Sequence, residues 1–566
     1  VKLFPHQVNG LRFLQKRESM DEIFKGGMLC DDMGLGKTVQ TLALIVSNKP
    51  TETDLKTIDE LKLKATLIIC PVALASQWKD EAESKCPGIK VLIFHGPKRT
   101  DSITELGKYD IVITSYLTVV SEFDKAKSSS PLYKGVWWRI VLDEAHIIKN
   151  KKTKMAIACC NLKSFKRFCL TGTPVQNNID ELQSLFVFLR INKYANIDVW
   201  TSEIKNLIKE SQTEKALNLL SKELKQMMLR RTKAVLNASN NSGFELPQKK
   251  IHRILIKFYP SERKLYRAIE AKILNNIGDD FDFKSSETKN GGTSYIYTLV
   301  YLLRLRQVAC HWKLLFENNP DNEETVHTEL TTNSKSDSGG NDLDQLFDSL
   351  SINTNNCEIC MSKIENSSNK LCANCLNMLK PPLESKSLIS NAKVDKLLSI
   401  LSEQKTRKTI IFSEFTKMLS ILETTLKSQG FKVVKYIGSM NRLQRDEVLT
   451  KMKTDPNTTI MLCSLKCASL GLNLTCASRV ILYNPHYNPA IIDQAIDRVY
   501  RLGQTQAVDV YELIVDDSIE LKISELQDKK RALARAVADG DETAKLKLVS
   551  KLTREELKTL MFGPDR

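Results

Sequence analysis

The sequence lacks any apolar run long enough to cross a membrane, although 42% of its 566 residues are hydrophobic. A crossing helix needs about 20 consecutive apolar residues, so we expect no membrane-spanning segment and no membrane partner. We recognise no signal peptide in these residues and expect none. Because the chain begins at Val1, nearly on a motif, targeting signals can lie outside it.

The sequence also lacks the dense cysteine framework of a small secreted domain. Its fourteen cysteines are spread through apolar stretches such as those around Cys30, Cys169 and Cys463, apart from one cluster. This usage is typical of reduced thiols in an intracellular protein.

Acidic residues are scarce relative to basic ones, and the net charge is +16. Residues 317–350 hold nine acids and one base, so that segment carries −8 and the remainder carries +24. A strongly basic body favours a polyanionic partner. Charge alone leaves a basic protein without a nucleic-acid role as an equal alternative.

Two regions alternate short apolar strands with helices, and 566 residues are too many for one core. Such alternation predicts parallel sheets wrapped in helices, with ligands at the carboxyl ends of the strands. The expected strands are 28–30, 66–70, 91–94, 110–115, 139–142 and 167–170 in the first region, and 409–412, 432–436, 459–463, 479–483 and 508–511 in the second.

The stretch between these regions is expected to be largely helical, with helices over 214–233 and around 302–307 and a loop over 279–294. Residues 317–356 are polar and acidic, which predicts disorder. The predicted domains are a first lobe with a helical protrusion (1–235), a helical insertion or linker (236–316), an acidic insert (317–356), a zinc insert (357–376), a second lobe (377–515) and a C-terminal helical brace (516–566).

Near the start, the apolar run 28–30 leads into Asp32-Met33-Gly34-Leu35-Gly36-Lys37-Thr38. A strand, a glycine loop and a helix N-terminus form a cradle for phosphate. Lys37 would reach the β- and γ-phosphates, and the Thr38 hydroxyl would bind Mg²⁺. The strict motif begins with glycine where this chain has Asp31, so a simple glycine turn is the alternative.

A second strand ends in Asp143-Glu144-Ala145-His146. A carboxylate at a strand end beside a phosphate loop is placed to hold Mg²⁺. We therefore assign Asp143 to the metal, Glu144 to the attacking water and His146 to coupling with neighbouring motifs. An acidic strand end without catalytic function is the alternative.

Arg498 and Arg501 lie one helical turn apart in the segment from Gln494 to Gln504. Phosphoryl transfer needs positive charge on the equatorial oxygens, which is the role of an arginine finger. A surface helix with two arginines is the alternative.

The cysteine cluster reads Cys357-x-x-Cys360, eleven residues, then Cys372-x-x-Cys375. Four thiolates at this spacing suit one tetrahedral Zn²⁺, and four free thiols in a degenerate insert are the alternative. No histidine lies between His327 and His486, and no cysteine lies between Cys375 and Cys463. The second metal site of a RING-type ubiquitin ligase is therefore missing.

Together these motifs resemble the Swi/Snf-type DNA translocases of helicase superfamily two. The resemblance covers nearly the whole chain and implies an α/β fold with two tandem RecA-like lobes, helical insertions and a small zinc insert. It rests on residues 5–7, 32–38, 76–78, 114–116, 143–146, 170–177, 229–233, 471–475 and 494–504. The position of the insert is similar to that in the RING-bearing postreplication-repair subgroup, and the C-terminal segment resembles its SUMO-targeted branch in yeast.

The resemblance implies further site residues. The expected ATP-binding set is completed by Gln7, Asp32, Met33, Gly34, Leu35, Gly36 and Gln494, and the coupling set by Thr171, Gly172 and Gln504. The expected DNA-backbone contacts are Gln77, Trp78, Thr114, Ser115, Ser413, Ser464, Asn473 and Tyr487. Backbone contacts give affinity without reading sequence, as a stepping motor requires.

The function implied is that of a nuclear, ATP-dependent double-stranded DNA translocase that remodels or strips protein–DNA complexes. Its cofactors would be ATP, Mg²⁺ and Zn²⁺. Nucleosomes are candidate partners, as are SUMO-modified proteins bound through regions outside this chain. The alternatives are a ubiquitin or SUMO ligase, against which the halved zinc site argues; a non-catalytic DNA scaffold; and an RNA helicase, since Asp-Glu-Ala-His occurs there too.

Overall fold

The computed structural model describes residues 2–19, 25–51, 54, 62–97, 99–125, 130–172, 179–210, 212–238, 246–277, 291–315, 357, 372–373, 375, 391–468 and 472–538. The predicted acidic insert, Cys360, the motif residues 173–177 and residues 539–566 lie outside them. Within the described ranges, no helix combines the length and apolar character that a membrane crossing needs.

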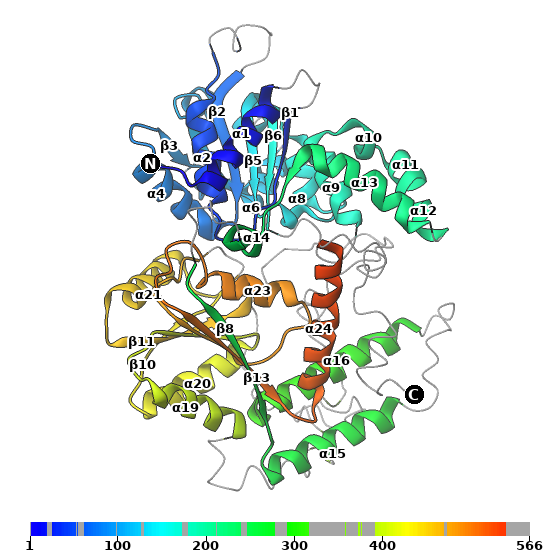
Figure 1. Ribbon diagram of the computed structural model, residues 1–566, viewed down its shortest axis with the longest axis vertical. Helices are drawn as coiled ribbons and strands as arrows, with labels where there is room; N and C mark the ends of the chain where they lie inside the picture. Colours follow the sequence, from blue (N-terminus) through cyan, green and yellow to red (C-terminus); the bar gives the residue numbers. More distant parts are fainter. Residues whose placement is uncertain are drawn as a thin grey trace.

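The chain forms two stacked α/β lobes, which confirms the expected fold class (Figure 1). In lobe 1 the strands pair in the order β3-β4-β2-β5-β6-β1-β7, and every pairing is parallel. These strands are β1 (Lys25–Leu29), β2 (Lys62–Cys70), β3 (Val91–Ile93), β4 (Ile111–Ser115), β5 (Val136–Asp143), β6 (Ser164–Leu170) and β7 (Met228–Leu229).

Helices cover both faces of this sheet because its strands present apolar side chains to both sides. Val141 packs in the layer shared with α1, α2 and α4, whereas Ile140 and Leu142 pack with α6, α8 and α9. The lobe 1 helices are α1 (Pro5–Ser19), α2 (Lys37–Ser47), α4 (Ala75–Lys85), α5 (Ile103–Leu106), α6 (Tyr116–Asp124), α7 (Pro131–Lys134), α8 (Lys154–Asn161), α9 (Asp180–Leu189), α10 (Asn192–Ala195), α11 (Ile197–Trp200), α12 (Leu207–Lys209) and α13 (Thr213–Met227), with the short turns η1 (Val72–Leu74), η2 (Ala145–Ile148) and η3 (Thr201–Asn206).

Lobe 2 is a second parallel sheet in the order β10-β11-β9-β12-β13-β8, again wrapped on both faces. Its strands are β8 (Lys249–Ile256), β9 (Thr409–Ser413), β10 (Lys432–Tyr436), β11 (Thr458–Ser464), β12 (Arg479–Leu482) and β13 (Val508–Val515). The remaining helices are α14 (Lys233–Ala238), α15 (Pro260–Ile277), α16 (Gly291–Cys310), α19 (Ala392–Glu403), α20 (Thr416–Ser428), α21 (Arg442–Thr454), α22 (Leu465–Ala468), α23 (Pro489–Asp497) and α24 (Ile519–Ala538), with the turn η4 (Trp312–Leu315).

Three expectations about the connecting region are wrong. The helix expected over 214–233 ends at Met227, because the next two residues join the lobe 1 sheet as β7. Gly291 and Gly292 begin α16 and do not belong to a loop. The segment 236–316 is not a helical linker throughout, since β8 pairs with β13 along its whole length.

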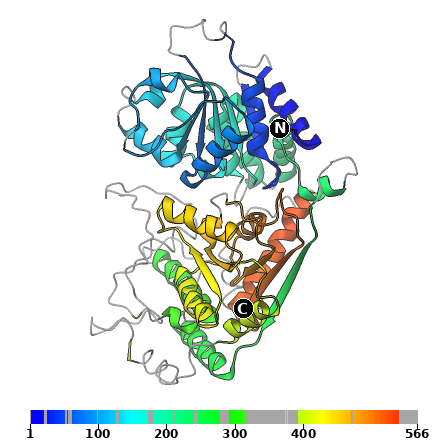
Figure 2. The ribbon, with the colours of Figure 1, turned by 90° about the vertical axis from the view of Figure 1, so that its left-hand side faces the viewer.

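The two lobes are also seen as separate bodies in Figure 2, which is turned by 90° from Figure 1. The helix α14 lies where they meet (Figure 1). The helix α24 crosses lobe 2 and rises towards lobe 1. It is the described part of the expected C-terminal brace.

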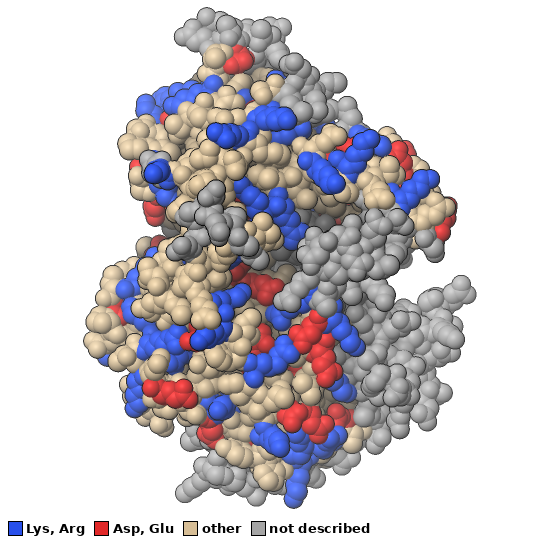
Figure 3. Space-filling model, in the orientation of Figure 1, with Lys and Arg blue, Asp and Glu red and all other residues tan. Residues whose placement is uncertain are grey.

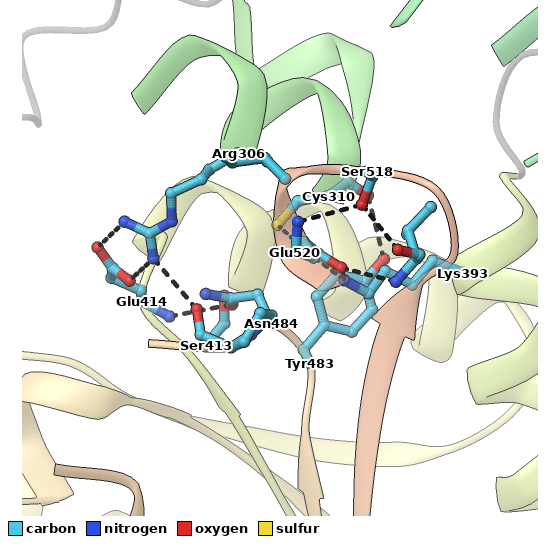
Figure 4. Close-up of polar contacts among 12 residues, drawn as sticks. Arg306, Cys310, Lys393, Ser413, Glu414, Tyr483, Asn484, Ser518 and Glu520 are labelled. Carbon is cyan, nitrogen blue, oxygen red and sulfur yellow. Dashed lines mark hydrogen bonds and ion pairs between the residues drawn. The ribbon is translucent and has the colours of Figure 1, made fainter. Parts of the chain in front are cut away.

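A buried polar network fastens α16 and α24 to lobe 2 (Figure 4). Arg306 of α16, which is 2% exposed, donates to Glu414 after β9 at 3.0 Å. Lys393 of α19 pairs with Glu520 of α24 at 2.6 Å, and both side chains are 1% exposed. Because buried charges need partners, these pairs hold the added helices in a defined position on the lobe.

Candidate active site

The glycine loop lies between β1 and α2, at the carboxyl end of the lobe 1 sheet. Gly34 and Gly36 have φ of 85° and 83°, in the left-handed region that favours glycine. Lys37 is the first residue of α2, so the loop delivers its backbone amides and a lysine to a helix N-terminus. The Lys37 ammonium donates to the carbonyls of Asp31 at 2.6 Å and Asp32 at 3.4 Å.

Asp31, which replaces the usual first glycine, has a structural partner that the motif did not predict. Its carboxylate is fully buried and accepts from the guanidinium of Arg231, with Nε at 2.9 Å, and from Gln40 at 3.2 Å. Arg231 also donates to the carbonyl of His6. One arginine, in the chain after β7, therefore ties the start of the phosphate loop to the first turn of α1.

Asp143 is the last residue of β5, which pairs with β6. The strand β6 pairs in turn with β1, which leads into the glycine loop. The Asp143 carboxylate accepts from Trp78 Nε1 at 2.7 Å and from the Glu144 amide at 3.0 Å. Burial raises the pKa of Asp143, and the Glu144 carboxylate raises it further, whereas the Trp78 hydrogen bond and Lys37 lower it. Because a cation favours the ionised carboxylate, Mg²⁺ bound there would lower this pKa again.

Glu144 adopts φ of 52°, one of three positive values among the described non-glycine residues. A left-handed conformation costs a non-glycine residue roughly 1–2 kcal/mol, and such strain gathers at functional sites. His146 Nδ1 lies 3.4 Å from the Glu144 carboxylate and Arg498 lies 3.7 Å from it. Burial would raise the pKa of Glu144, but His146, Arg498 and Lys37 together lower it, so the group is ionised.

Both predicted arginine fingers lie just after α23 in lobe 2, which ends at Asp497, and they face the lobe 1 groups. Arg498 is 5% exposed, and its guanidinium contacts Met33 Sδ at 4.0 Å as well as Glu144. A Cβ placed on Gly34 would lie 2.5 Å from Cβ of Arg501, so the loop and the second finger are in close contact. The structure thus brings the two ends of the site together.

The cationic groups fit a polyphosphate. The buried Arg501 Nε has no hydrogen-bond partner among the described residues, although it lies beside the phosphate loop. Burial lowers the pKa of Arg498 and of Arg501, and Arg498 lowers that of Arg501 further. An anion between them and Lys37 would satisfy that donor and relieve the repulsion.

The other expected ATP and coupling residues surround this centre. Gln7 Nε2 lies 3.4 Å from the Leu35 carbonyl and lines the position where Gly36 would carry a side chain. Gln494 is a buried residue of α23, and Gly172 packs against Met33. Their direct contacts with nucleotide stay predictions, as do those of the rest of the set, which comprises Thr38, Thr171 and Gln504. Gln504 donates to the Thr475, Ala477 and Val499 carbonyls, so it stabilises a loop of lobe 2.

Several side chains expected to contact DNA point into the protein, so their contact with DNA stays a prediction. Trp78 is 2% exposed and holds Asp143, Thr114 donates to the Phe94 carbonyl, and Ser413 donates to Asn484. The polar atoms of these three side chains make hydrogen bonds within the protein, near the ends of strands.

The other DNA candidates divide by exposure. Ser115 caps α6, Ser464 ends β11, and the Tyr487 ring lies under the Arg306 guanidinium, so all three side chains are buried. Gln77 is half-buried and Asn473 is exposed, so these two remain open predictions.

The structure describes three of the four cysteines that are expected to bind zinc. The sulfurs of Cys357, Cys372 and Cys375 lie within 4.8 Å of one another. Tetrahedral Zn²⁺ with Zn–S bonds of about 2.3 Å fits such a group of thiols. Cys360, the fourth expected ligand, lies outside the described residues.

Charge is distributed differently over the two lobes on the face shown in Figure 3. On lobe 1 the charged side chains seen there are mostly Lys and Arg, whereas positive and negative patches alternate on lobe 2. The first lobe therefore carries the more uniform positive surface on this side of the molecule.

Comparison with known proteins is consistent with this geometry. The model of the SNF2-related domain matches residues 6–314, and that of the helicase conserved C-terminal domain matches residues 392–503. The chain is 31% identical to DNA repair protein RAD5B of Arabidopsis thaliana, over 95% of this chain and 47% of that protein. It is 30% identical to the ATP-dependent helicase ULS1 of Saccharomyces cerevisiae, over 100% of this chain and 42% of that protein.

A putative SWI/SNF-related regulator of chromatin, subfamily A member 3-like 1, from Arabidopsis thaliana is 32% identical over 94% of this chain and 71% of that protein. Among solved structures, the Sulfolobus solfataricus SWI2/SNF2 ATPase core in complex with dsDNA is 26% identical, covers 98% of each chain and superposes with a TM-score of 0.39. The chain spans about half the length of several curated relatives that it matches.

Proposed function

The chain belongs to the SNF2-related family of ATPases, and from that premise we propose that it couples ATP hydrolysis to movement along double-stranded DNA. The observation that carries the proposal is the meeting of the two lobes at one site. Arg498 of lobe 2 lies 3.7 Å from Glu144 of lobe 1, and Arg501 packs on Gly34 of the phosphate loop.

The residues of lobe 1 bind and orient the nucleotide. The loop amides and Lys37 hold its β- and γ-phosphates, and Thr38 with Asp143 would hold Mg²⁺. When bound, Mg²⁺ neutralises charge on the phosphate oxygens. Glu144 is ionised, so it can accept a proton from the water that attacks the γ-phosphate.

Lobe 2 supplies the charge that the transition state needs. Arg498 and Arg501 reach the phosphates from the side opposite Lys37, and arginine fingers raise rates by about 10³–10⁵-fold. Because the two halves of the site lie on different lobes, nucleotide binding favours closure and product release favours opening. Each cycle then shifts the two lobes relative to one another along a bound duplex.

Duplex DNA is the partner that the charge and the relatives favour. Outside residues 317–350 the chain carries +24, and contacts with backbone phosphates need no sequence readout. Relatives that match 95% of this chain include proteins named for DNA repair. We accordingly place the protein in the nucleus, where it would remove or remodel protein–DNA complexes, including nucleosomes, with recruitment by SUMO-modified proteins through regions outside this chain.

The decisive experiment is steady-state ATP hydrolysis without nucleic acid and with single-stranded DNA, duplex DNA, nucleosomes or duplex RNA. Glu144→Gln, which should bind ATP without hydrolysing it, is the matched control. Strong stimulation by duplex DNA would support the proposal, and a further rise with nucleosomes would favour remodelling. Stimulation by RNA alone, or no hydrolysis under any condition, would overturn it.

We also propose that Cys357, Cys360, Cys372 and Cys375 hold one Zn²⁺ and that the chain has no ubiquitin ligase activity of its own. Elemental analysis should find one zinc per chain, and Cys375→Ser should lower it. Two zinc ions per chain, or autoubiquitination by the purified chain with an E2 enzyme, would contradict this assignment.

A further inference from the structure

The segment 229–233 runs along the start of the phosphate loop of lobe 1 and is joined to it by backbone hydrogen bonds. The Cys30 amide donates to the Leu229 carbonyl at 2.7 Å, and the Asp32 amide donates to the Arg231 carbonyl at 2.9 Å. The Lys233 amide then donates to the Asp32 carboxylate at 2.9 Å. Any displacement of the loop therefore displaces the backbone of Lys233.

The side chain of Lys233 leaves lobe 1 and enters lobe 2. Its ammonium donates to the Asp497 carboxylate at 2.7 Å and to the Tyr500 carbonyl at 2.7 Å. The Lys233 side chain is 11% exposed and that of Asp497 is 21% exposed, so water screens the ion pair poorly. The ammonium carries three N–H donors, so it can serve both acceptors at once.

The two acceptors lie on either side of the first arginine finger. Asp497 directly precedes Arg498, and Tyr500 directly precedes Arg501. A single amine thus fixes both ends of the four-residue stretch that aims the arginines at the phosphate loop.

We propose that Lys233 is an interlobe positioning residue, which links the phosphate loop to residues 497–501 and sets the distance from which Arg498 and Arg501 reach the nucleotide. This inference rests on the proposed ATPase function and names a device by which that site is regulated. Lys233 touches no reacting atom. It acts through Asp32 on one side and through the finger segment on the other.

The test compares Lys233→Met, Asp497→Asn and the double variant with the wild-type protein in DNA-stimulated ATP hydrolysis. Lys249→Met is the matched control, because Lys249 lies 5.1 Å from the Tyr500 ring, close to the 5.2 Å of Lys233, yet it is an exposed residue of β8 in lobe 2. Asp497→Asn is isosteric and leaves the bond to Tyr500 in place, so it decides the outcome if Lys233→Met does not fold.

We expect each single variant to lower kcat about tenfold, the range of coupling between contacting residues, with KM for ATP changed less than twofold. The double variant should resemble Lys233→Met, since loss of the ammonium already removes the contact with Asp497. Lys249→Met should retain wild-type kcat. Unchanged kcat in both single variants, or multiplied losses in the double variant, would overturn the proposal while leaving the proposed function intact.

Hydrogen exchange separates failure of this inference from failure of the proposed function. In Lys233→Met, amides of residues 30–36 and 497–504 should exchange faster than in the wild type, whether or not the protein hydrolyses ATP. Unchanged exchange at both segments would remove the link. Absence of wild-type hydrolysis with every nucleic acid would instead remove the proposed function.

Discussion

The two halves of the active site are held in different ways. In lobe 1 the site groups have partners within their own lobe: Lys37 donates to the Asp31 carbonyl, and Asp143 accepts from Trp78. The fingers of lobe 2 are positioned by contacts with lobe 1, where Arg498 faces Glu144 and Arg501 packs on Gly34. We infer that lobe 1 is assembled to bind nucleotide by itself, whereas hydrolysis requires both lobes.

The difference has an electrostatic side. Arg498 is buried and Arg501 is half-buried near it, and burial lowers the pKa of each. Closure brings these two cations towards Lys37, so an anion between them favours the closed arrangement. Binding energy at lobe 1 is thereby converted into approach of lobe 2.

The largest expected effect comes from removing the Lys37 ammonium, the phosphate-binding group of lobe 1. Lys37→Ala should abolish measurable hydrolysis and should also weaken ATP binding, because under the proposed function the lysine would hold the phosphates whether or not lobe 2 has closed. Equilibrium binding of a fluorescent ATP analogue measures the loss of affinity, and steady-state turnover measures the loss of hydrolysis. Normal ATP affinity in this variant would break the division between the lobes.

The complementary variant is Arg498→Ala. We expect kcat to fall about 10³-fold or more while ATP affinity stays within about tenfold of the wild type, since the finger acts mainly in the transition state. The same two assays apply. Equal losses in affinity and turnover would mean that lobe 2 binds the ground state as strongly as lobe 1 does.

Sequence reasoning located the site residues that belong to recognisable spacings, and it missed those that act through distant partners. Lys37, Glu144, Arg498 and Arg501 carry their chemistry in a local pattern. The role of Trp78 depends on a hydrogen bond to a residue 65 positions away, and no spacing within either motif encodes it. The polar candidates Thr114 and Ser413 look alike in sequence whether they face solvent or a buried carbonyl.

The fold shows the same limit. Alternating strands predicted both sheets, because an apolar run between turn residues is a local signal. The assignment of β8 to lobe 2 depends on its parallel pairing with β13, more than 250 residues later. Arg231 explains Asp31 in the same way, as a partner across 200 positions. Long-range pairs of this kind become visible only once the sheets are formed.

A smaller effect should follow from altering the contact between the halves at Gly34. Gly34→Ala faces both a φ of 85° and a Cβ contact of 2.5 Å with Arg501, so the lobes must separate. We expect kcat to fall about 10–100-fold, as misplacement of reacting groups typically costs.

The matched control is Gly430→Ala. Gly430 has φ of 81° and nothing within 4 Å of its added Cβ, so it carries the backbone strain without the interlobe clash. Both variants should lose about 1–2 kcal/mol of stability, measured by denaturant unfolding. If Gly430→Ala lowered kcat as much as Gly34→Ala does, strain rather than lobe contact would explain the loss.

The smallest effect tests how far lobe 1 is self-contained. Trp78→Phe keeps the buried ring but removes the donor that lowers the pKa of Asp143. Because that bond stabilises the ionised carboxylate, its loss raises the pKa, and a larger fraction of Asp143 is protonated at any given acidic pH. The acid limb of the kcat/KM profile should therefore move to higher pH, and extra Mg²⁺ should partly restore it.

Trp138→Phe is the control, since its indole nitrogen donates at 3.3 Å to the Asn48 carbonyl and not to Asp143. At pH 8 the Trp78→Phe rate should fall only severalfold, in line with the loss of one hydrogen bond to a charged group, worth about 1.5–3 kcal/mol and partly offset by bound metal. An acid limb that stayed in place would mean that lobe 1 does not prepare Asp143 for the metal, and the contrast between a self-held half and a positioned half would weaken accordingly.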